Sequence, residues 1–363
     1  MIRLLIVDDS ALMRRLLSEI FSAEPDFEIE IARSGPEALA MLPVFKPDVV
    51  SLDIHMPEMN GLACLDRIMV EYPCPVVMIS SLTAEGADET LEAIALGAID
   101  FVAKPKGPVS IEIEAIASTI VEKVRAASQA KLSRATRLAE RVRLRVAAPK
   151  APKKRLGKTA RVLQTKPAIG AGAEGLVLVG TSTGGPAALD VLLSGLPGDF
   201  RWPIVIAQHM PASFTGALAR RLDRLYALSV VEVARPTPLV AGYAYVGRGD
   251  ADLIISRRAG ALVAMPAPSS AEYHWHPSVD RFVASAMQHV APESLIGVLM
   301  TGMGADGAQA MAELADRGGH TIAEAEETAI VWGMPGALVG LGGADQVVPL
   351  PDIAAQLLSL VGW

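Results

Sequence analysis

Cysteine and long apolar runs are both scarce in this chain of 363 residues. Its two cysteines, Cys64 and Cys74, have no spacing typical of a disulfide framework, which favours a reducing compartment over secretion. No apolar stretch approaches the roughly 18–20 residues that a membrane-spanning helix needs. The first apolar run also meets Asp8 and Asp9 too early for a signal peptide. We therefore expect a soluble, cytoplasmic protein with no direct membrane insertion.

Acidic and basic residues are distributed unevenly. Residues 129–166 hold 13 Lys or Arg against one acid, Glu140, so this segment carries +12 in a chain of −7 and the rest carries −19. Length and charge predict two domains and a connector, which we place at 1–122, 123–172 and 173–363. A nucleic-acid-binding arm is an alternative for the basic segment. We favour a linker with a helix-forming first half and a proline-containing second half, and expect no nucleic-acid partner.

The first domain alternates apolar runs with amphipathic segments, which predicts a compact, doubly wound α/β fold. Five polar residues follow or end these runs. Three are carboxylates, Asp8, Asp9 and Asp53, and the others are Ser80 and Lys104. The expected strands are Arg3–Val7, Glu28–Ala32, Val49–Leu52, Val76–Ile79 and Ile99–Val102.

Crowded carboxylates repel one another unless a hard divalent cation lies among them. Mg²⁺ suits a few carboxylates together with water and phosphate oxygens. The cluster therefore predicts metal-assisted phosphoryl chemistry. The alternative is that each acid caps a helix and that Lys104-Pro105 is a surface turn, which we favour for any one residue but not for the set.

Asp8-Asp9, the run from Asp53 to Gly61 (DIHMPEMNG), Ser80 and Lys104-Pro105 together resemble the response-regulator receiver domain over about residues 1–122. The resemblance implies a flavodoxin-like sheet on which Asp53 accepts a phosphoryl group. It implies that Asp8 and Asp9 hold Mg²⁺ together with Asp53. It also implies that Ser80 and Lys104 contact the phosphoryl oxygens and that Phe101 is the switch aromatic residue.

The second domain again alternates strands and helices, and three polar loops follow apolar runs. Ser182 follows Leu176–Val179, His209 follows Ile204–Ala207, and Asp306 follows Leu295–Met300. In an open α/β sheet the carboxyl ends of the strands meet at one crevice, so these side chains can converge. A hydroxyl, an imidazole and a carboxylate are the parts of a serine hydrolase. We predict a Rossmann-like hydrolase domain.

The loops around Ser182 and Asp306 are rich in glycine, so backbone amides can approach a substrate. The amides of Thr183, Gly184 and Met303 are candidates for binding an oxyanion. Nucleotide binding is the alternative for residues 180–185, because glycine-rich turns before helices also hold phosphates. This segment has neither the lysine of a P-loop nor the Gly-x-Gly-x-x-Gly spacing, so we favour hydrolysis.

Two further groups compete for roles. His274-Trp275-His276 has a His-x-His form that sometimes binds zinc, but no Cys or third His nearby completes a site. Asp280 is a rival to Asp306 as the acid of the triad. We prefer Asp306 because its loop follows a strongly apolar strand.

Gly180–Pro186, Gln208-His209-Met210-Pro211, Ser278-Val279-Asp280 and Thr301–Gly307 resemble the catalytic domain of the chemotaxis protein-glutamate methylesterases. With the receiver, this resemblance covers nearly the whole chain. It implies hydrolysis of glutamate γ-methyl esters on the cytoplasmic helices of chemoreceptors, often with deamidation of receptor glutamines. It implies the triad Ser182, His209 and Asp306, and an oxyanion amide at Met303.

Two residues depart from the expected pattern of that family. Thr181 stands where we expect Ala, and His276 stands where Arg is common. The first should be harmless. The second bears on how an acidic receptor surface is held.

We expect Ser182 to attack the ester carbonyl while His209 takes its proton, with no metal needed for this reaction. Mg²⁺ is expected only in the receiver, where a histidine-kinase partner phosphorylates Asp53. Fragment 173–363 is expected to be more active than the unphosphorylated whole chain. The alternatives are a phosphorylation-gated adaptor that binds receptors without turnover, and an esterase for a different methylated protein or small ester.

Overall fold

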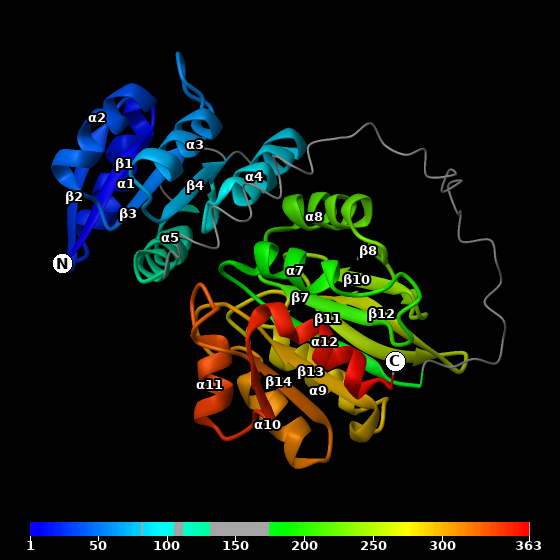
Figure 1. Ribbon diagram of the computed structural model, residues 1–363. Helices are drawn as coiled ribbons and strands as arrows, with labels where there is room; N and C mark the ends of the chain where they lie inside the picture. The colour runs from blue at the N-terminus through cyan, green and yellow to red at the C-terminus, as the bar shows by residue number, and fades with distance from the viewer. Residues whose placement is uncertain (81–82, 105–111, 131–173, 363) are drawn as a thin grey trace.

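The computed structural model describes residues 1–80, 83–104, 112–130 and 174–362, which form two α/β units (Figure 1). The predicted linker, 123–172, lies outside the described residues except for its first part, up to residue 130. None of the helices in the described ranges is long and apolar enough to cross a membrane.

The first unit is built on a five-stranded sheet in which every pair of neighbours is parallel. The strand order is β2-β1-β3-β4-β5, the flavodoxin-like order that we expected. Each strand lies within one residue of its predicted bounds. The strands are β1 (Ile2–Val7), β2 (Phe27–Ala32), β3 (Val49–Asp53), β4 (Val76–Ser80) and β5 (Asp100–Ala103).

Five helices accompany this sheet, and local chemistry explains where most of them begin. Ser10, Ser34, Asn60 and Thr83 precede the first four helices, and the side chain of each accepts a backbone N–H from the first turn. The helices are α1 (Ala11–Ser22), α2 (Gly35–Phe45), α3 (Gly61–Glu71), α4 (Ala84–Leu96) and α5 (Glu112–Ser128).

Helix α5 continues past residue 122, where we placed the end of the first domain. Ile120, Val121, Val124 and Ala127 are buried at spacings of one, three and three residues and pack with the core strands. Because this apolar stripe continues, the helix remains on the sheet for six residues more than we expected.

The second unit is built on a seven-stranded parallel sheet with the order β15-β14-β13-β6-β7-β10-β8. Strand β6 lies between β13 and β7, so the chain runs outward from β6 in both directions. Ligands bind at such a point in open α/β sheets. The strands are β6 (Leu176–Thr181), β7 (Ile204–Gln208), β8 (Ser229–Val233), β10 (Tyr243–Gly247), β13 (Leu295–Leu299), β14 (His320–Glu324) and β15 (Gln346–Val348).

Helices and one short 3₁₀ segment connect these strands. They are α7 (Gly185–Ser194), α8 (Ala212–Leu225), α9 (Val279–Met287), η1 (Pro292–Ser294), α10 (Ala308–Asp316), α11 (Met334–Gly340) and α12 (Leu350–Leu360). The sheet carries apolar cores on both faces. One contains Val177 and Ile206, and the other contains Leu178 and Val205.

A small antiparallel sheet of β11 (Asp252–Arg258), β12 (Ala261–Ala267) and β9 (Thr237–Pro238) was not anticipated. Its hairpin turns at Ala259 and Gly260, which have φ angles of 48° and 83°. Positive φ at both central residues is the condition for a two-residue hairpin turn of type I′. Alanine rarely adopts it, so the sequence carried no clear turn signal here.

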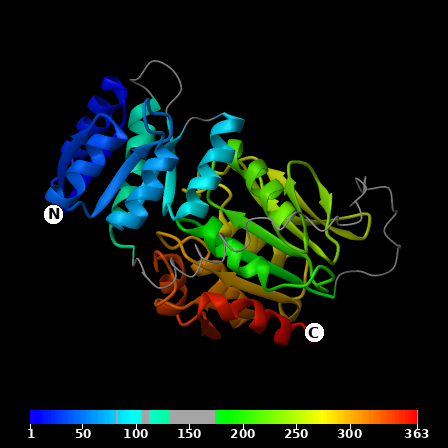
Figure 2. The same ribbon diagram turned by 45° about the horizontal axis from the view of Figure 1, so that its top comes forward.

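The two units touch close to the loop that follows β6. Helix α4 packs on α8, and it also approaches α7 (Figures 1 and 2). The Phe101 ring of β5 lies 4.2 Å, centroid to centroid, from the Phe214 ring of α8. The hydroxyl of Thr183 donates to Asp100 Oδ2 at 2.7 Å. The first unit therefore contacts the residue that directly follows Ser182.

Candidate active site

Ser182, the predicted nucleophile, lies in the tight turn between β6 and α7 and is 4% exposed. Its N–H donates to the carbonyl O of Thr301 at 3.0 Å. Its carbonyl O accepts from Gly185 N at 2.8 Å and from Gln208 Nε2 at 3.0 Å. These bonds fix the backbone of the turn from both neighbouring strands. The contribution of Gln208 was not anticipated, although it stands beside His209 in the sequence.

Gly302 lets the loop after β13 approach Ser182 closely. A Cβ added at Gly302 would lie 2.7 Å from the Cβ of Ser182 and 2.4 Å from the Sδ of Met334. Any side chain at this position would displace the loop or the serine. The predicted oxyanion residue, Met303, is the next residue along.

His209 follows β7 and joins the loops of Ser182 and Asp306. Its Nε2 lies 2.8 Å from Asp306 Oδ2, and its side chain is 2% exposed. In the described residues its Nδ1 is buried without a hydrogen-bond partner. An imidazole that donates through Nε2 carries its lone pair on Nδ1. The same described ranges contain no hydrogen bond between Ser182 Oγ and His209, so that contact has to form for proton transfer.

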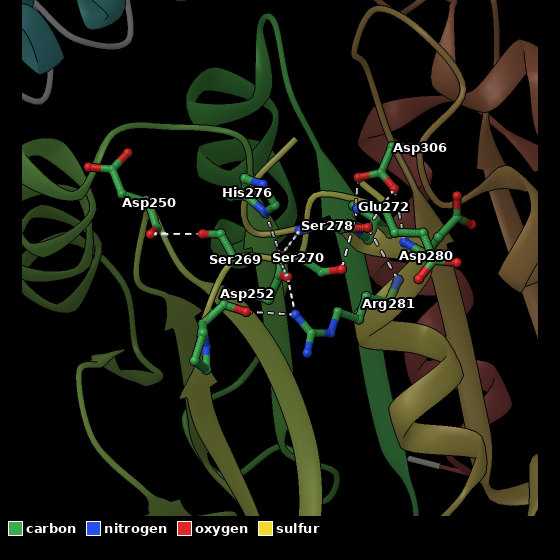
Figure 3. A network of polar contacts seen from close by, with 12 residues as sticks. Asp250, Asp252, Ser269, Ser270, Glu272, His276, Ser278, Asp280, Arg281 and Asp306 are labelled. Atoms are coloured by element: carbon green, nitrogen blue, oxygen red, sulfur yellow. Dashed lines mark hydrogen bonds and ion pairs between the residues drawn. The ribbon is translucent and has the colours of Figure 1, made fainter. Parts of the chain in front are cut away.

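Asp306 lies at the N-terminus of α9, and donors surround its carboxylate (Figure 3). Oδ1 accepts from Ser278 Oγ and Asp280 N, both at 3.0 Å, and Oδ2 accepts from Val279 N at 2.7 Å. Burial alone would raise the pKa of Asp306, but the hydrogen bond and charge of His209 and the backbone donors hold this pKa below its usual range. The carboxylate therefore stays ionised beside the imidazole.

Asp280, the rival acid, points to a different helix. Its Oδ1 accepts from Ala310 N at 2.9 Å, in the first turn of α10. Burial and the nearby charge of Asp306 raise the pKa of Asp280, against the hydrogen bond from Ala310. The imidazole of His209 contacts Asp306 and not Asp280.

Trp275 stacks on His209, with ring centroids 5.3 Å apart and planes 13° from parallel. Nothing in the sequence indicated this contact, because residue 275 is 66 positions from residue 209. The indole covers one face of the His209 imidazole. This contact restricts rotation of the imidazole ring out of its observed plane. His274 packs edge-on against Trp275 at 4.8 Å.

His276 is engaged elsewhere. Its Nδ1 lies 2.8 Å from Asp252 Oδ1, and Asp252 also forms an ion pair with Arg281 (Figure 3). Burial raises the pKa of Asp252, but the bonds from His276, Ser278 and Arg281 outweigh burial and lower it. Within the described ranges, His274 and His276 belong to no cluster of three metal-binding side chains, so the zinc alternative finds no support.

A cavity of about 680 Å³ lies between the two units next to this site. Trp275, Met303 and Trp332 of the second unit line it, and so do Glu122 and Arg125 of α5. A substrate that reaches Ser182 through this cavity therefore passes residues of both units.

Backbone amides near Ser182 remain available to a ligand. In the described part of the chain, the amides of Thr183, Gly184 and Met303 donate no hydrogen bond. Each is thus a candidate donor to an oxyanion, and the side chain of Met303 is itself nearly buried.

The first unit brings Asp8, Asp9 and Asp53 together, as predicted. One carboxylate oxygen from each lies within 4.8 Å of the others, and Lys104 Nζ lies 2.8 Å from Asp53 and 3.1 Å from Asp8. Burial and the charge of Asp53 raise the pKa of Asp8, against the opposing effect of Lys104. Three hard oxygen ligands at the end of a sheet fit a magnesium ion.

Ser80 and Phe101, predicted to respond to phosphorylation, are held in this structure by residues that the sequence did not indicate. Ser80 Oγ accepts from Thr90 Oγ1 at 2.6 Å and donates to the carbonyl O of Gly86 at 3.1 Å, so it is bonded to α4. Phe101 is 2% exposed and faces Phe214 across the contact between the units.

Comparisons with known proteins agree on both units. The family described as response regulator receiver domain matches residues 4–115, and the family described as CheB methylesterase matches residues 177–357. The chain is 54% identical over 362 residues to protein-glutamate methylesterase/protein-glutamine glutaminase 2 of Rhodopseudomonas palustris, covering 99% of this chain and 98% of that protein.

A relative in Rhodospirillum rubrum, protein-glutamate methylesterase/protein-glutamine glutaminase 3, is 50% identical over 357 residues, with 98% of this chain and 95% of that protein covered. Among solved structures, the catalytic domain of the Thermotoga maritima CheB methylesterase matches with a TM-score of 0.50 and 36% identity. That match covers 52% of this chain and 99% of the Thermotoga chain.

Proposed function

This chain belongs to the CheB methylesterase family, and from that premise we propose that it hydrolyses glutamate γ-methyl esters on chemoreceptors and deamidates receptor glutamines to glutamate. The names of its relatives and the receiver domain support an activity that phosphorylation regulates. The observation that carries the proposal is the 2.8 Å contact between His209 Nε2 and Asp306, which leaves the buried Nδ1 as the only ring nitrogen able to take a proton.

In the first half of the reaction, Ser182 Oγ attacks the ester carbonyl carbon, and its proton passes to His209 Nδ1. The resulting tetrahedral oxyanion is bound by the amide of Met303, with Thr183 or Gly184 as the second donor. When the intermediate collapses, the C–O bond to the methoxy group breaks. His209 gives its proton to that oxygen, and methanol leaves.

In the second half, water loses a proton to His209 and attacks the acyl-serine carbonyl. The bond to Ser182 Oγ breaks, His209 returns the proton to it, and glutamate is released. A glutamine side chain follows the same steps and releases ammonia. Asp306 remains ionised throughout and stabilises the imidazolium form of His209. We assign no metal to this reaction.

Regulation is assigned to the receiver. Asp53 accepts a phosphoryl group from a histidine kinase, while Ser80 and Lys104 contact the phosphoryl oxygens. Asp8, Asp9 and Asp53 would hold Mg²⁺, which neutralises charge during phosphoryl transfer. Phosphorylation then acts through Phe101 and Asp100, because both touch the second unit.

The remaining assignments follow from the same premise. We place the receiver at residues 1–128, since α5 ends at Ser128, and the linker from there to residue 172, with the esterase at 173–363. The substrates are the cytoplasmic helices of receptors, so the protein acts in the cytoplasm.

Methanol release from methyl-labelled chemoreceptor membranes tests this function. Wild type is expected to release methanol in the presence of Mg²⁺, and more so after a small-molecule phosphodonor is added. Ser182→Ala should lose nearly all release, and Asp53→Ala should lose only the response to the donor. Release by Ser182→Ala at the wild-type rate would contradict the mechanism.

Covalent labelling of Ser182 by an activated phosphonate separates the alternatives. Labelling without methanol release would point to an esterase of another methylated substrate. If neither occurs, the chain is a binding adaptor without turnover.

A further inference from the structure

Glu324, the last residue of β14, is a buried carboxyl group that the mechanism above does not use. It is 0% exposed, and none of the ion pairs among the described residues includes it. The strand that carries it lies next to β13, whose following loop carries Met303. Glu324 therefore lies beside the loop whose amide at Met303 is predicted to bind the oxyanion.

The carboxylate of Glu324 holds two separate loops. Oε2 accepts the N–H of Thr301 at 2.8 Å, and Oε1 accepts the hydroxyl of Thr328 at 3.1 Å. Its backbone carbonyl also accepts from Trp332 Nε1 at 2.8 Å. One loop leads to Met303, and the other supplies Trp332 to the wall of the cavity.

Thr301 in turn fixes the turn that contains Ser182. Its carbonyl O accepts Ser182 N at 3.0 Å, while its hydroxyl donates to the carbonyl O of Thr183 at 2.9 Å and accepts Val331 N at 3.0 Å. A continuous series of hydrogen bonds thus runs from Glu324 through Thr301 to Ser182. Both parts of the site, the nucleophile and the oxyanion amides, depend on the position of one residue, Thr301, whose N–H and carbonyl O belong to the two peptide groups on either side of it.

We propose that Glu324 is a positioning residue of the esterase, which holds Thr301 so that Ser182 and the Met303 amide face the same carbonyl group. This inference rests on the proposed function. Without an acceptor at residue 324, the buried N–H of Thr301 loses its partner and the loop shifts to find another. Small displacements of catalytic groups reduce the rate of reaction far more than they reduce binding.

The protonation state of Glu324 does not decide this role. Burial raises the pKa of Glu324 to about 7, against the hydrogen bonds from Thr301 and Thr328. The protonated carboxyl still offers Oε2 to Thr301, while its O–H can face the hydroxyl of Thr328, which has the carbonyl O of Ala325 as another acceptor at 3.2 Å. Neither threonine is charged. Glutamine resembles the protonated form, with a carbonyl oxygen as acceptor and an NH₂ group as donor.

The test compares Glu324→Met, which keeps the side-chain length but replaces the carboxylate with a weakly accepting thioether, with Glu324→Gln. The full chain is used with Mg²⁺ and phosphodonor, and an alkyl fluorophosphonate labels Ser182. We expect Glu324→Met to be labelled about 10²-fold more slowly, as for the loss of an oxyanion donor. Its kcat for methanol release should fall equally with KM changed less than about twofold, while Glu324→Gln stays within about threefold of wild type.

Thr328→Val is the matched control, since it removes the other partner of the carboxylate and leaves the bond to Thr301. We expect a loss of less than about threefold. A folded Glu324→Met protein that labels at the wild-type rate would overturn the inference. So would a loss in Glu324→Gln or Thr328→Val as large as that in Glu324→Met.

If Glu324→Met does not fold, Glu324→Asp takes its place, because its carboxylate is too short to reach Thr301 and should slow labelling about tenfold. A wild-type rate in folded Glu324→Asp overturns the inference. Labelling of wild type without methanol release rejects the receptor substrate but leaves the test of Glu324 intact. Absence of labelling in wild type rejects both proposals.

Discussion

Asp8 is buried and Asp306 is partly buried, and both lie beyond the carboxyl ends of parallel strands, yet their surroundings are opposite. Burial and the charge of Asp53 raise the pKa of Asp8. At Asp306, burial is outweighed by His209 and by the donors of α9, and the pKa falls. Asp8 Oδ2 and Asp53 Oδ2 share one cation, Lys104 Nζ, at 3.1 Å and 2.8 Å, whereas each oxygen of Asp306 has donors of its own.

The difference separates two ways of using a carboxylate. The receiver site has more negative charge than its own donors satisfy, so it favours a cation and a transferred group from outside. The esterase site satisfies its carboxylate internally and needs nothing further to keep it ionised. Aspartate thus serves one site that needs a bound cation to balance its charge and one site whose hydrogen-bond donors all come from the protein.

The largest effect is expected when the internally satisfied carboxylate is changed. Asp306→Asn keeps the shape but offers an amide to His209, which favours the wrong tautomer, and kcat for methanol release should fall about 10⁴-fold. Asp280→Asn is the matched control, because its side-chain oxygen can still accept from Ala310, and it should lose less than about tenfold. A larger loss in Asp280→Asn than in Asp306→Asn would make Asp280 the acid of the triad.

Removal of metal should affect only the other site. Chelation of Mg²⁺ is expected to remove nearly all of the stimulation by phosphodonor, since Asp8, Asp9 and Asp53 then repel the incoming phosphoryl group. The unstimulated rate of methanol release should not change. A chelator that lowers this basal rate would show that the esterase itself needs a metal.

Glu324 is a further buried carboxyl group, and its side chain accepts from only two donors. Its effect on stability should depend on pH. Its pKa of about 7 in the folded protein exceeds the ordinary value of 4.5, so the free energy of unfolding falls as pH rises from about 4.5 to about 7. A shift of this size corresponds to about 3 kcal/mol. Glu324→Gln lacks this term, so its stability relative to wild type, measured by urea unfolding of both proteins, should be greater at pH 8 than at pH 5.

Asp306 should behave in the opposite sense, because its pKa is lowered and its stabilising effect is lost as pH falls. A relative stability of Glu324→Gln that is the same at both pH values would show that Glu324 is already charged at pH 5 in the folded protein, with a pKa close to its ordinary value.

The smallest effect is expected where the two units meet. Asp100→Ala removes the acceptor for Thr183 and should raise the activity of the unphosphorylated chain about twofold to tenfold, as for the net contribution of one ordinary hydrogen bond. Lys123→Met is the control, since Lys123 contacts Asp100 Oδ1 without touching the esterase. The prediction fails if Asp100→Ala leaves the basal rate unchanged while fragment 173–363 exceeds the whole chain.

The sequence predicted the parts of the structure that depend on local pattern and on parallel topology. The five receiver strands lie within one residue of their expected bounds, because apolar runs and cap residues mark their ends. His209 meets Asp306 across 97 positions, since parallel strands end at the same edge of the sheet. The hairpin at Ala259-Gly260 escaped prediction, because an alanine with positive φ gives no turn signal.

Roles that arise from tertiary contacts could not be predicted. Trp275 stacks on His209, and Glu324 reaches Thr301, only because the loops of the second unit pack together. Asp306 was expected from its glycine-rich loop, but its place at the N-terminus of α9 depends on a helix 26 to 28 positions earlier in the chain. A side chain of ordinary type and spacing gives no local sign of such partners.

The cavity that Glu122 and Arg125 share with Trp275 and Trp332 has a thermodynamic consequence. If phosphorylation of the receiver makes this cavity more accessible to a receptor helix, then linkage requires an occupied cavity to favour the phosphorylated state by the same factor. A receptor helix bound in the cavity would therefore shift the equilibrium at Asp53 towards the phosphorylated form. Binding of the substrate would in this way favour the state that is active towards it.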